Sequence, residues 1–116
     1  MQLDFSEREG VACVAIAGRI TFGTLEPGQD PLTPQVPDIY SRRVMFDLSG
    51  TDYIDSTGVS WLLTCHKRCR EAGGKLVLHS INPMVKQVLQ VLKLEKVLRL
   101  ADNADMARSE LNEVTA

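Results

Sequence analysis

A serine at position 56 occupies the part of the sequence with the clearest capacity for chemistry. It belongs to the run Asp55-Ser56-Thr57-Gly58, which follows an apolar segment, Val44-Met45-Phe46, and the turn Asp47-Leu48-Ser49-Gly50. Asp55 or Ser56 can accept hydrogen bonds from the free amides of a first helical turn, and Gly58 permits close approach of another backbone. The Ser56 hydroxyl is then accessible and sits at a positive helix end. The simplest interpretation is that these residues only cap a helix.

The cysteines and histidines offer a second kind of chemistry, metal binding. Cys65 and Cys69 lie one turn apart on a predicted helix, so they supply only half of a tetrahedral zinc shell, with His79 as the sole distant reinforcement. We therefore predict that both thiols pack in the core and that the chain has neither a metal site nor a cofactor. The three cysteines, the third being Cys13, have no spacing typical of a disulfide framework, which fits a reducing compartment.

Catalysis and phosphoryl acceptance by an aspartate are weaker interpretations. Ser56 lacks a Gly-x-Ser-x-Gly elbow and has no obvious histidine as its base, so we predict no catalytic residue and no enzyme activity. A response-regulator receiver would use Asp47 as its acceptor. It would also need a pair of acidic residues after the first central strand, where this chain has Gly18-Arg19-Ile20-Thr21. We reject that class.

The periodicity of apolar residues predicts the strands that position these groups. Alternation from Leu3 to Arg8 indicates a half-buried strand, and Glu9-Gly10 indicates a hairpin turn. The run from Val11 to Ala17 is apolar on both faces, as expected of a central strand covered on two sides. Further strands are predicted at Val44 to Phe46, Lys75 to His79 and Val97 to Leu100.

A helical period begins at Ser56 and stops at Gly73-Gly74, after a short loop that holds Ile54. We expect its apolar side to hold Val59, Leu62, Leu63, His66 and Cys69, with Trp61 and Cys65 on the margin. Its polar arc includes Thr57, Ser60 and Thr64. A half-exposed Trp61 would serve as an interface anchor. A ring folded back onto the core margin is an equally good interpretation.

Two more helices and one irregular segment complete the predicted architecture. Asn82-Pro83 is a typical helix start, and the following stripe comprises Val85, Val88, Leu89 and Leu92. Asp102 can cap a last helix that carries Met106, Leu111 and Val114. Four of the five prolines lie between Thr24 and Pro37, where they exclude a long helix, so we expect a surface loop with at most one or two helical turns.

Length and charge restrict the class of protein. A chain of 116 residues has room for one domain, and a formal net charge of -2 provides no summed positive field for nucleic acid. No window approaches the length of a spanning helix, and the N-terminus lacks a signal-peptide pattern. We expect a cytoplasmic protein. The fold class is α/β, with a mixed sheet and amphipathic helices mainly on one face.

The run Asp47-Leu48-Ser49-Gly50 followed by Asp55-Ser56-Thr57-Gly58-Val59 resembles the motif of the STAS domain, in the anti-sigma factor antagonist family. Gly73-Gly74-Lys75-Leu76 and Ser80 to Val85 also resemble that family in type and spacing. The resemblance implies one domain over residues 1–116. Two departures are a Thr21 in place of an acidic residue, at a position that helps to form the partner surface, and a proline-rich irregular segment at about 24–41 in place of the first helix.

The resemblance implies a partner-switching protein. Unphosphorylated, it would bind an anti-sigma factor that is also a serine kinase and so free a sigma factor; phosphorylation of Ser56 would end the binding, and a serine phosphatase would restore it. The partner-binding residues implied are Thr21, Asp55, Ser56, Thr57, Gly58, Ser60, Trp61 and Thr64. The alternatives are a constitutive STAS scaffold or regulatory subunit in which Ser56 is only a cap, and a small-ligand or nucleotide sensor with the loop after Ile20 as a lid.

Overall fold

A mixed β-sheet forms the centre of the molecule in the computed structural model, which describes residues 1–26 and 28–113. Within these residues the six strands are β1 (Gln2–Arg8), β2 (Val11–Ile20), β3 (Arg43–Asp47), β4 (Thr51–Ile54), β5 (Lys75–His79) and β6 (Arg99–Ala101). The order is β1-β2-β3-β5-β6, and β4 pairs with the last residues of β2. Only β1 runs antiparallel to its neighbour; the other described pairs are parallel. The predicted α/β class with a mixed sheet is confirmed.

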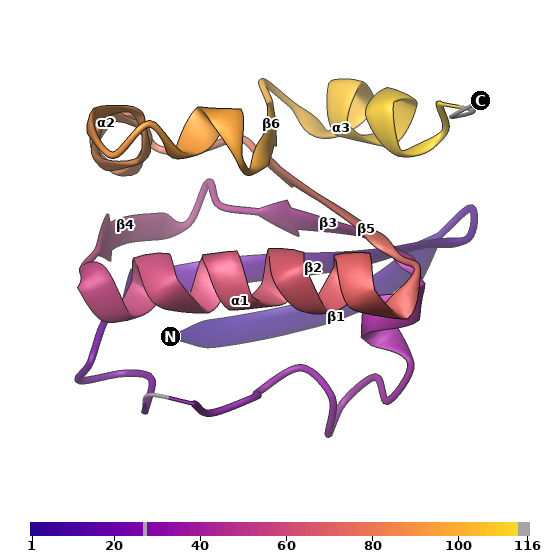
Figure 1. Cartoon of the computed structure of the whole chain (residues 1–116), viewed down its shortest axis with the longest axis horizontal. Coiled ribbons are helices and arrows are strands. Elements are labelled where there is room, and N and C mark those ends of the chain that lie inside the picture. The colour runs from indigo at the N-terminus through magenta and orange to yellow at the C-terminus, as the bar shows by residue number, and fades with distance from the viewer. Residues whose placement is uncertain (27, 114–116) are drawn as a thin grey trace.

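The helices lie on both faces of this sheet but unequally. They are α1 (Ser56–Ala72), α2 (Pro83–Val91) and α3 (Ala104–Leu111), with short 3-10 helices η1 (Ile39–Ser41) and η2 (Leu94–Lys96). Buried residues of α1 and α2 join the larger apolar cluster, which contains Phe46 and Leu78 of the sheet. Figure 1 shows β3 and β4 between α1 and α3, and α3 covers a smaller cluster around Met45 and Val77.

Turn and cap residues follow the sequence prediction with one exception. The β1–β2 turn places Glu9 and Gly10 at φ 54° and 79°, a geometry that suits a two-residue hairpin. Asn82 caps α2 by accepting from the Met84 amide at 3.0 Å. The predicted cap of α3 by Asp102 is wrong, because Asn103 accepts from the Met106 amide at 2.9 Å and so caps a helix that begins one residue later.

The buried side of α1 is wider than its sequence indicates. Trp61 and Cys65, expected at the margin of the apolar side, are buried. Leu63 and His66, expected on the apolar side itself, are only half-buried. The physical reason is that α1 packs against η1 as well as against the sheet. Burial of Cys65 and Cys69 confirms the prediction that both thiols pack in the core.

Several strand and helix details differ from expectation. The predicted loop around Ile54 is the strand β4. Only the first part of β2 is covered on two faces, because α3 is eight residues long and leaves Ala15 and Ala17 exposed. The last strand begins at Arg99 rather than Val97, because the chain before it forms η2 and a turn. Leu92 and Met106 are exposed rather than buried, and Val114 lies outside the described residues.

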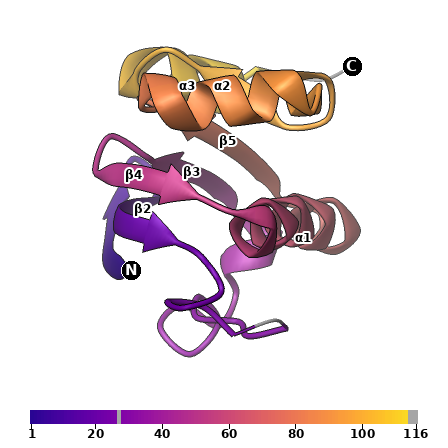
Figure 2. The same ribbon diagram turned by 90° about the vertical axis from the view of Figure 1, so that its left-hand side faces the viewer.

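The proline-rich segment packs against α1 instead of lying free on the surface (Figure 2). Leu25, Leu32 and Ile39 are buried in the larger cluster, and η1 supplies the one turn of regular helix among the described residues of 24–41. The carboxylate of Asp30 accepts hydrogen bonds from Thr33, Tyr40 and Arg68, the last at 2.8 Å. The segment is therefore held in place by three buried apolar side chains and by the hydrogen bonds of the Asp30 carboxylate.

Candidate functional site

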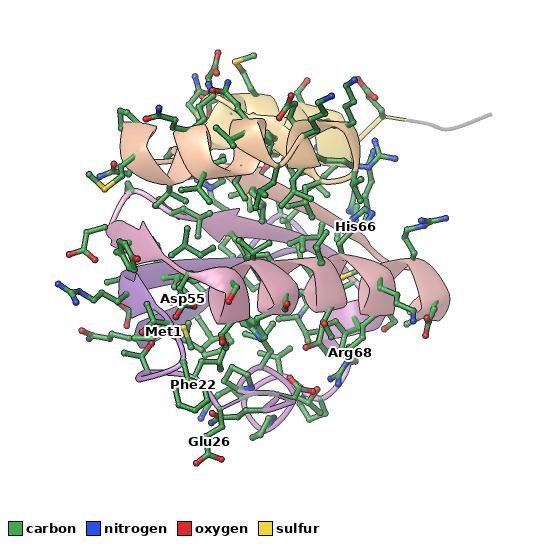
Figure 3. All side chains as sticks on the ribbon, turned by 60° about the vertical axis from the view of Figure 1, so that its left-hand side comes forward. Met1, Phe22, Glu26, Asp55, His66 and Arg68 are labelled. Carbon is green, nitrogen blue, oxygen red and sulfur yellow. The ribbon has the colours of Figure 1, made fainter. Side chains whose placement is uncertain are left out.

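Asp55 connects the start of α1 to the segment that follows β2. Its Oδ1 accepts a hydrogen bond from the Gly58 amide at 3.1 Å, which is the N-cap contact. Its Oδ2 accepts from the amide of Phe22 at 3.0 Å. Figure 3 shows Phe22 close to Asp55 at this end of the helix. One carboxylate thus fixes two segments that are thirty-three residues apart in sequence.

Gly58 allows α1 to begin this close to the sheet. A Cβ atom at position 58 would overlap the carbonyl oxygen of Ile20 and the side chain of Ile54. The Asp55 amide reaches the same carbonyl, that of Ile20, at 3.4 Å. The close approach expected from the glycine is therefore present, and it joins the carboxyl end of β2 to the first turn of α1.

The site carries a fixed negative charge before any modification. Hydrogen bonding from the Phe22 amide, with further bonds from amides of the helix start, lowers the pKa of the Asp55 carboxyl below its ordinary value. Asp55 is therefore ionised at neutral pH. Its charge is offset by backbone amides and by the positive end of α1, and no basic side chain of residues 1–26 or 28–113 forms an ion pair with it.

The hydroxyl groups of the predicted site differ in accessibility. Ser56, the first residue of α1, is exposed, whereas Thr57 is half-buried. Ser60 and Thr64 are exposed further along the same face, and the Thr64 hydroxyl donates to the Ser60 carbonyl at 2.9 Å. Thr21 lies at this end of the helix because the amide of its neighbour Phe22 donates a hydrogen bond to the Asp55 carboxylate.

Two of the predicted partner-binding residues are core residues in this structure. Gly58 is buried, and Trp61 retains only 6% of its surface. The Trp61 ring stacks on Phe46 with centroids 5.7 Å apart. The prediction of a half-exposed Trp61 is therefore wrong, and the alternative prediction, a ring turned to the core, is confirmed. The reason is that the proline-rich segment covers the side of α1 that would otherwise leave the ring open.

Sequence reasoning missed the residues that complete this surface. A groove of about 220 Å³ runs between α1 and the proline-rich segment. It is lined by Leu25, Glu26, Gly28, Gln29, Ser56, Thr57, Ser60, Trp61, Thr64 and Arg68. Phe22 is 69% exposed beside it. Phe22 lies next to the helix cap only in space. No pattern in the sequence signals this, because the hydrogen bond between Asp55 and the Phe22 amide joins segments thirty-three residues apart.

Other reactive groups lie apart from this site. Burial raises the pKa of the Cys69 thiol to about 11 and that of Cys65 as well, so both stay protonated. His79 is buried, and its Nδ1 pairs with the Ser80 hydroxyl at 2.9 Å. Within residues 1–26 and 28–113, no three side chains of His, Cys, Asp or Glu gather closely enough to hold a metal ion.

Three known proteins are similar to this chain. BtrV of Bordetella bronchiseptica, which is named as an anti-sigma factor antagonist, is 29% identical over 92% of this chain and 91% of its own length. A Thermotoga maritima structure, also named as an anti-sigma factor antagonist, has a TM-score of 0.81 at 19% identity and covers 96% of this chain and 95% of its own. The phosphorylated form of SpoIIAA, a Bacillus cell fate determinant, has a TM-score of 0.65 at 14% identity, covering 96% and 100%.

No helix among the described residues is both long and apolar enough to cross a membrane.

The family assignment follows from the sequence as a whole. The model of the STAS domain matches residues 2–107, which includes every strand of the sheet and the whole of α1. This chain therefore belongs to the STAS domain family.

Proposed function

We propose that this chain is an anti-sigma factor antagonist switched by phosphorylation of Ser56. Unphosphorylated, it binds an anti-sigma factor that is also a serine kinase, and the bound sigma factor is released. Phosphorylated, it dissociates from the kinase, and a serine phosphatase returns it to the binding form. The setting is the cytoplasm, in keeping with three cysteines that are free thiols. The chain itself contributes no catalysis.

One observation carries the proposal: the exposed hydroxyl of Ser56 follows an ionised Asp55 at the first position of α1. An exposed residue is accessible to the active site of a kinase, whereas Thr57 is half-buried. The family relationship supports the same assignment, because the relative of highest identity quoted above is named as an anti-sigma factor antagonist. The phosphorylated form of a protein with the same fold supports it further.

The charge of a phosphate explains how the switch acts on binding. A phosphate adds about -1.5 to -2 charges at neutral pH, to a chain whose formal net charge is -2. The positive end of α1 accommodates part of it, but Asp55 already accepts from the Gly58 amide there. The added charge must therefore face outward, where it repels acidic groups of a partner and disturbs few contacts of the core.

The proposed docking surface surrounds Ser56. It includes the exposed hydroxyls of Ser60 and Thr64, the half-buried Thr21 and Thr57, and the backbone near Asp55. Trp61 and Gly58 are buried beneath this surface, where they pack in the core. Phe22 adds an exposed apolar ring of the kind that interfaces use as an anchor.

The test compares charge at position 56 with the same charge elsewhere. Ser56→Asp should lose binding of the kinase, whereas Ser56→Ala should keep it. Ser109→Asp on α3, which is exposed and lies on the far face of the sheet, is the matched control and should also keep it. Binding is measured by pull-down from source-cell extract with identification of the captured kinase, and circular dichroism checks that each variant is folded.

Direct detection of the modification completes the test. After incubation with extract and ATP, intact-mass measurement should show one added phosphate, and peptide mapping should place it on Ser56. Equal capture of the kinase by Ser56→Asp and Ser56→Ala would refute the switch and leave a constitutive scaffold. Labelling of Thr57 instead would refute the acceptor assignment.

A further inference from the structure

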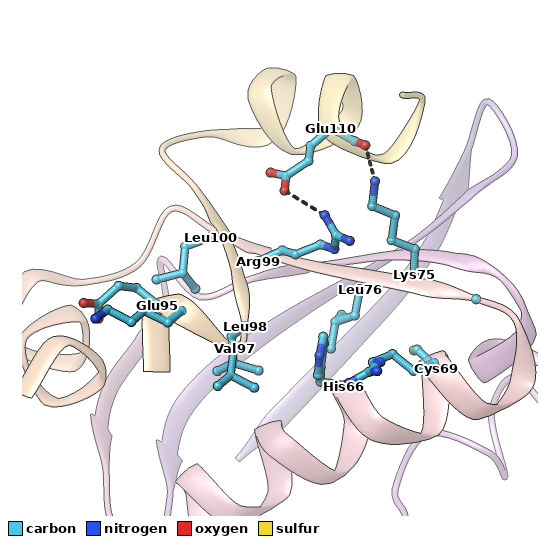
Figure 4. A pocket seen from close by; sticks show the side chains of 13 residues that line it. His66, Cys69, Lys75, Leu76, Glu95, Val97, Leu98, Arg99, Leu100 and Glu110 are labelled. Carbon is cyan, nitrogen blue, oxygen red and sulfur yellow. Dashed lines mark hydrogen bonds and ion pairs between the residues drawn. The ribbon is translucent and has the colours of Figure 1, made fainter. Parts of the chain in front are cut away.

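A cavity opens at the edge of the sheet, at the opposite end of α1 from Ser56. Strand β5 begins at Lys75 but pairs with β6 only from Val77, which lies opposite Arg99. The chain before β6 forms η2 and turns away, which leaves a space of about 620 Å³ (Figure 4). The space is lined by His66, Cys69, Arg70, Gly74, Lys75, Leu76, Glu95, Lys96, Val97, Leu98, Arg99, Leu100 and Glu110.

Positive charge is concentrated around this cavity. Arg70 comes from α1, Lys75 from β5, Lys96 from η2 and Arg99 from β6; among the described residues of the lining, only Glu95 and Glu110 carry carboxylates. The lining has an excess of two positive charges in a chain whose formal net charge is -2. Basic residues from four elements therefore line one space, against the sign of the molecule as a whole.

Most of this charge is not neutralised by the protein. Arg99 Nη1 lies 3.6 Å from a carboxylate oxygen of Glu110, but Lys75 donates to the backbone carbonyl of Glu110 at 2.7 Å. Neither Arg70 nor Lys96 has a carboxylate within 4.0 Å among the residues that the structure describes. The pKa of His66 is lowered by burial and, next, by Arg70 and Arg99. Arg70 and Arg99 thus both lie near enough to His66 to act on its ring.

The backbone adds a donor to this lining. The Lys75 amide donates to the Arg42 carbonyl, on the β3 side of β5. Because successive residues of a strand direct their backbone groups to alternate sides, the Leu76 amide faces the side where β6 has not yet begun. Leu76 lines the cavity. A backbone N–H and several cationic side chains are the groups that bind phosphate oxygens.

We propose that this cavity binds the phosphate group of a small phosphorylated molecule. Its volume lies within the range of about 300–1,000 Å³ usual for small-ligand sites. The clustering of basic residues around one space favours a compact anion over an extended acidic peptide, which would need them spread along a line. The site is separate from Ser56, and the proposal does not depend on the switch.

The experiment follows amide resonances of the full chain during titration with pyrophosphate, with ATP and with adenosine. Pyrophosphate and ATP should cause saturable shifts of residues 74–76 and 95–100, whereas adenosine should cause none. A bound anion favours the imidazolium form, so the pKa of His66 should rise when pyrophosphate is present. The charged groups that line the cavity with His66 are Arg70 on the same helix and, from the elements packed against it, Lys75, Glu95, Lys96, Arg99 and Glu110.

Paired variants separate a specific site from general charge. Arg70→Gln combined with Lys96→Gln should weaken pyrophosphate binding roughly tenfold or more, since each lost charge-assisted contact is strong. The control combines Lys67→Gln with Lys93→Gln. It also removes two exposed cations, one on α1 and one just before η2, but neither lines the cavity, so the affinity for pyrophosphate should change little. Equal weakening by both pairs, absence of saturation up to about 10 mM, or binding of polyglutamate but not of pyrophosphate would overturn the proposal.

Discussion

Replacing Gly58 by alanine tests how the fold positions the switch serine. The new Cβ would overlap the backbone carbonyl of Ile20, which cannot rotate away as a side chain would, and also the side chain of Ile54. The first turn of α1 must then move away from the end of β2. Overpacking of this kind costs about 1–3 kcal/mol, and the better helix propensity of alanine returns at most about 1 kcal/mol. Because the clash is with a backbone carbonyl, the cost lies in the upper part of that range, about 2–3 kcal/mol, and we expect a net loss of about 1–2 kcal/mol.

Thermal and urea denaturation measure this loss. For a chain of this size each kcal/mol lowers Tm by several degrees, so Gly58→Ala should melt roughly 3–10 °C below the parent chain. Gly23→Ala is the matched control, because a Cβ there meets only the Thr21 hydroxyl, at an ordinary 3.8 Å. If Gly58→Ala is as stable as the parent or more stable, the close contact between α1 and β2 does not exist as described.

Three further outcomes follow from the same contacts. Trp61→Ala should cost about 3–5 kcal/mol in urea denaturation because the ring is buried; a loss near zero would restore it as a surface anchor. Hydrogen bonding keeps the Asp55 pKa low in the folded chain, so stability should fall as pH drops below about 4 towards that pKa. Asp55→Asn should lose this part of the pH dependence, and identical pH profiles would contradict it. Arg68→Met removes the ion pair with Asp30 at 2.8 Å, so amides of residues 28–36 should exchange faster in hydrogen-exchange measurements while those of β5 stay protected.

The candidate site was predictable to the extent that it is local. The run from Asp55 to Gly58 predicts a capped helix start with an accessible hydroxyl, because the cap and the hydroxyl depend on residues within four positions of each other. The bond from Phe22 to Asp55 was not predictable, since it joins segments that only the sheet brings together. Trp61 was ambiguous for the same reason: its burial depends on a loop that precedes it by more than twenty residues.

Local patterns in the sequence alone determined the strands β1, β3 and β5, the whole length of α1, and the caps at Asn82 and Gly73. Each of these follows from periodicity or from hydrogen bonds between near neighbours. Tertiary structure decided which side of α1 faces the core, how far β2 is covered, and where β4 pairs. It also decided that four basic residues line one space beside β6. These features depend on contacts between distant segments, and burial and electrostatic fields are properties of the assembled layers rather than of any stretch of chain.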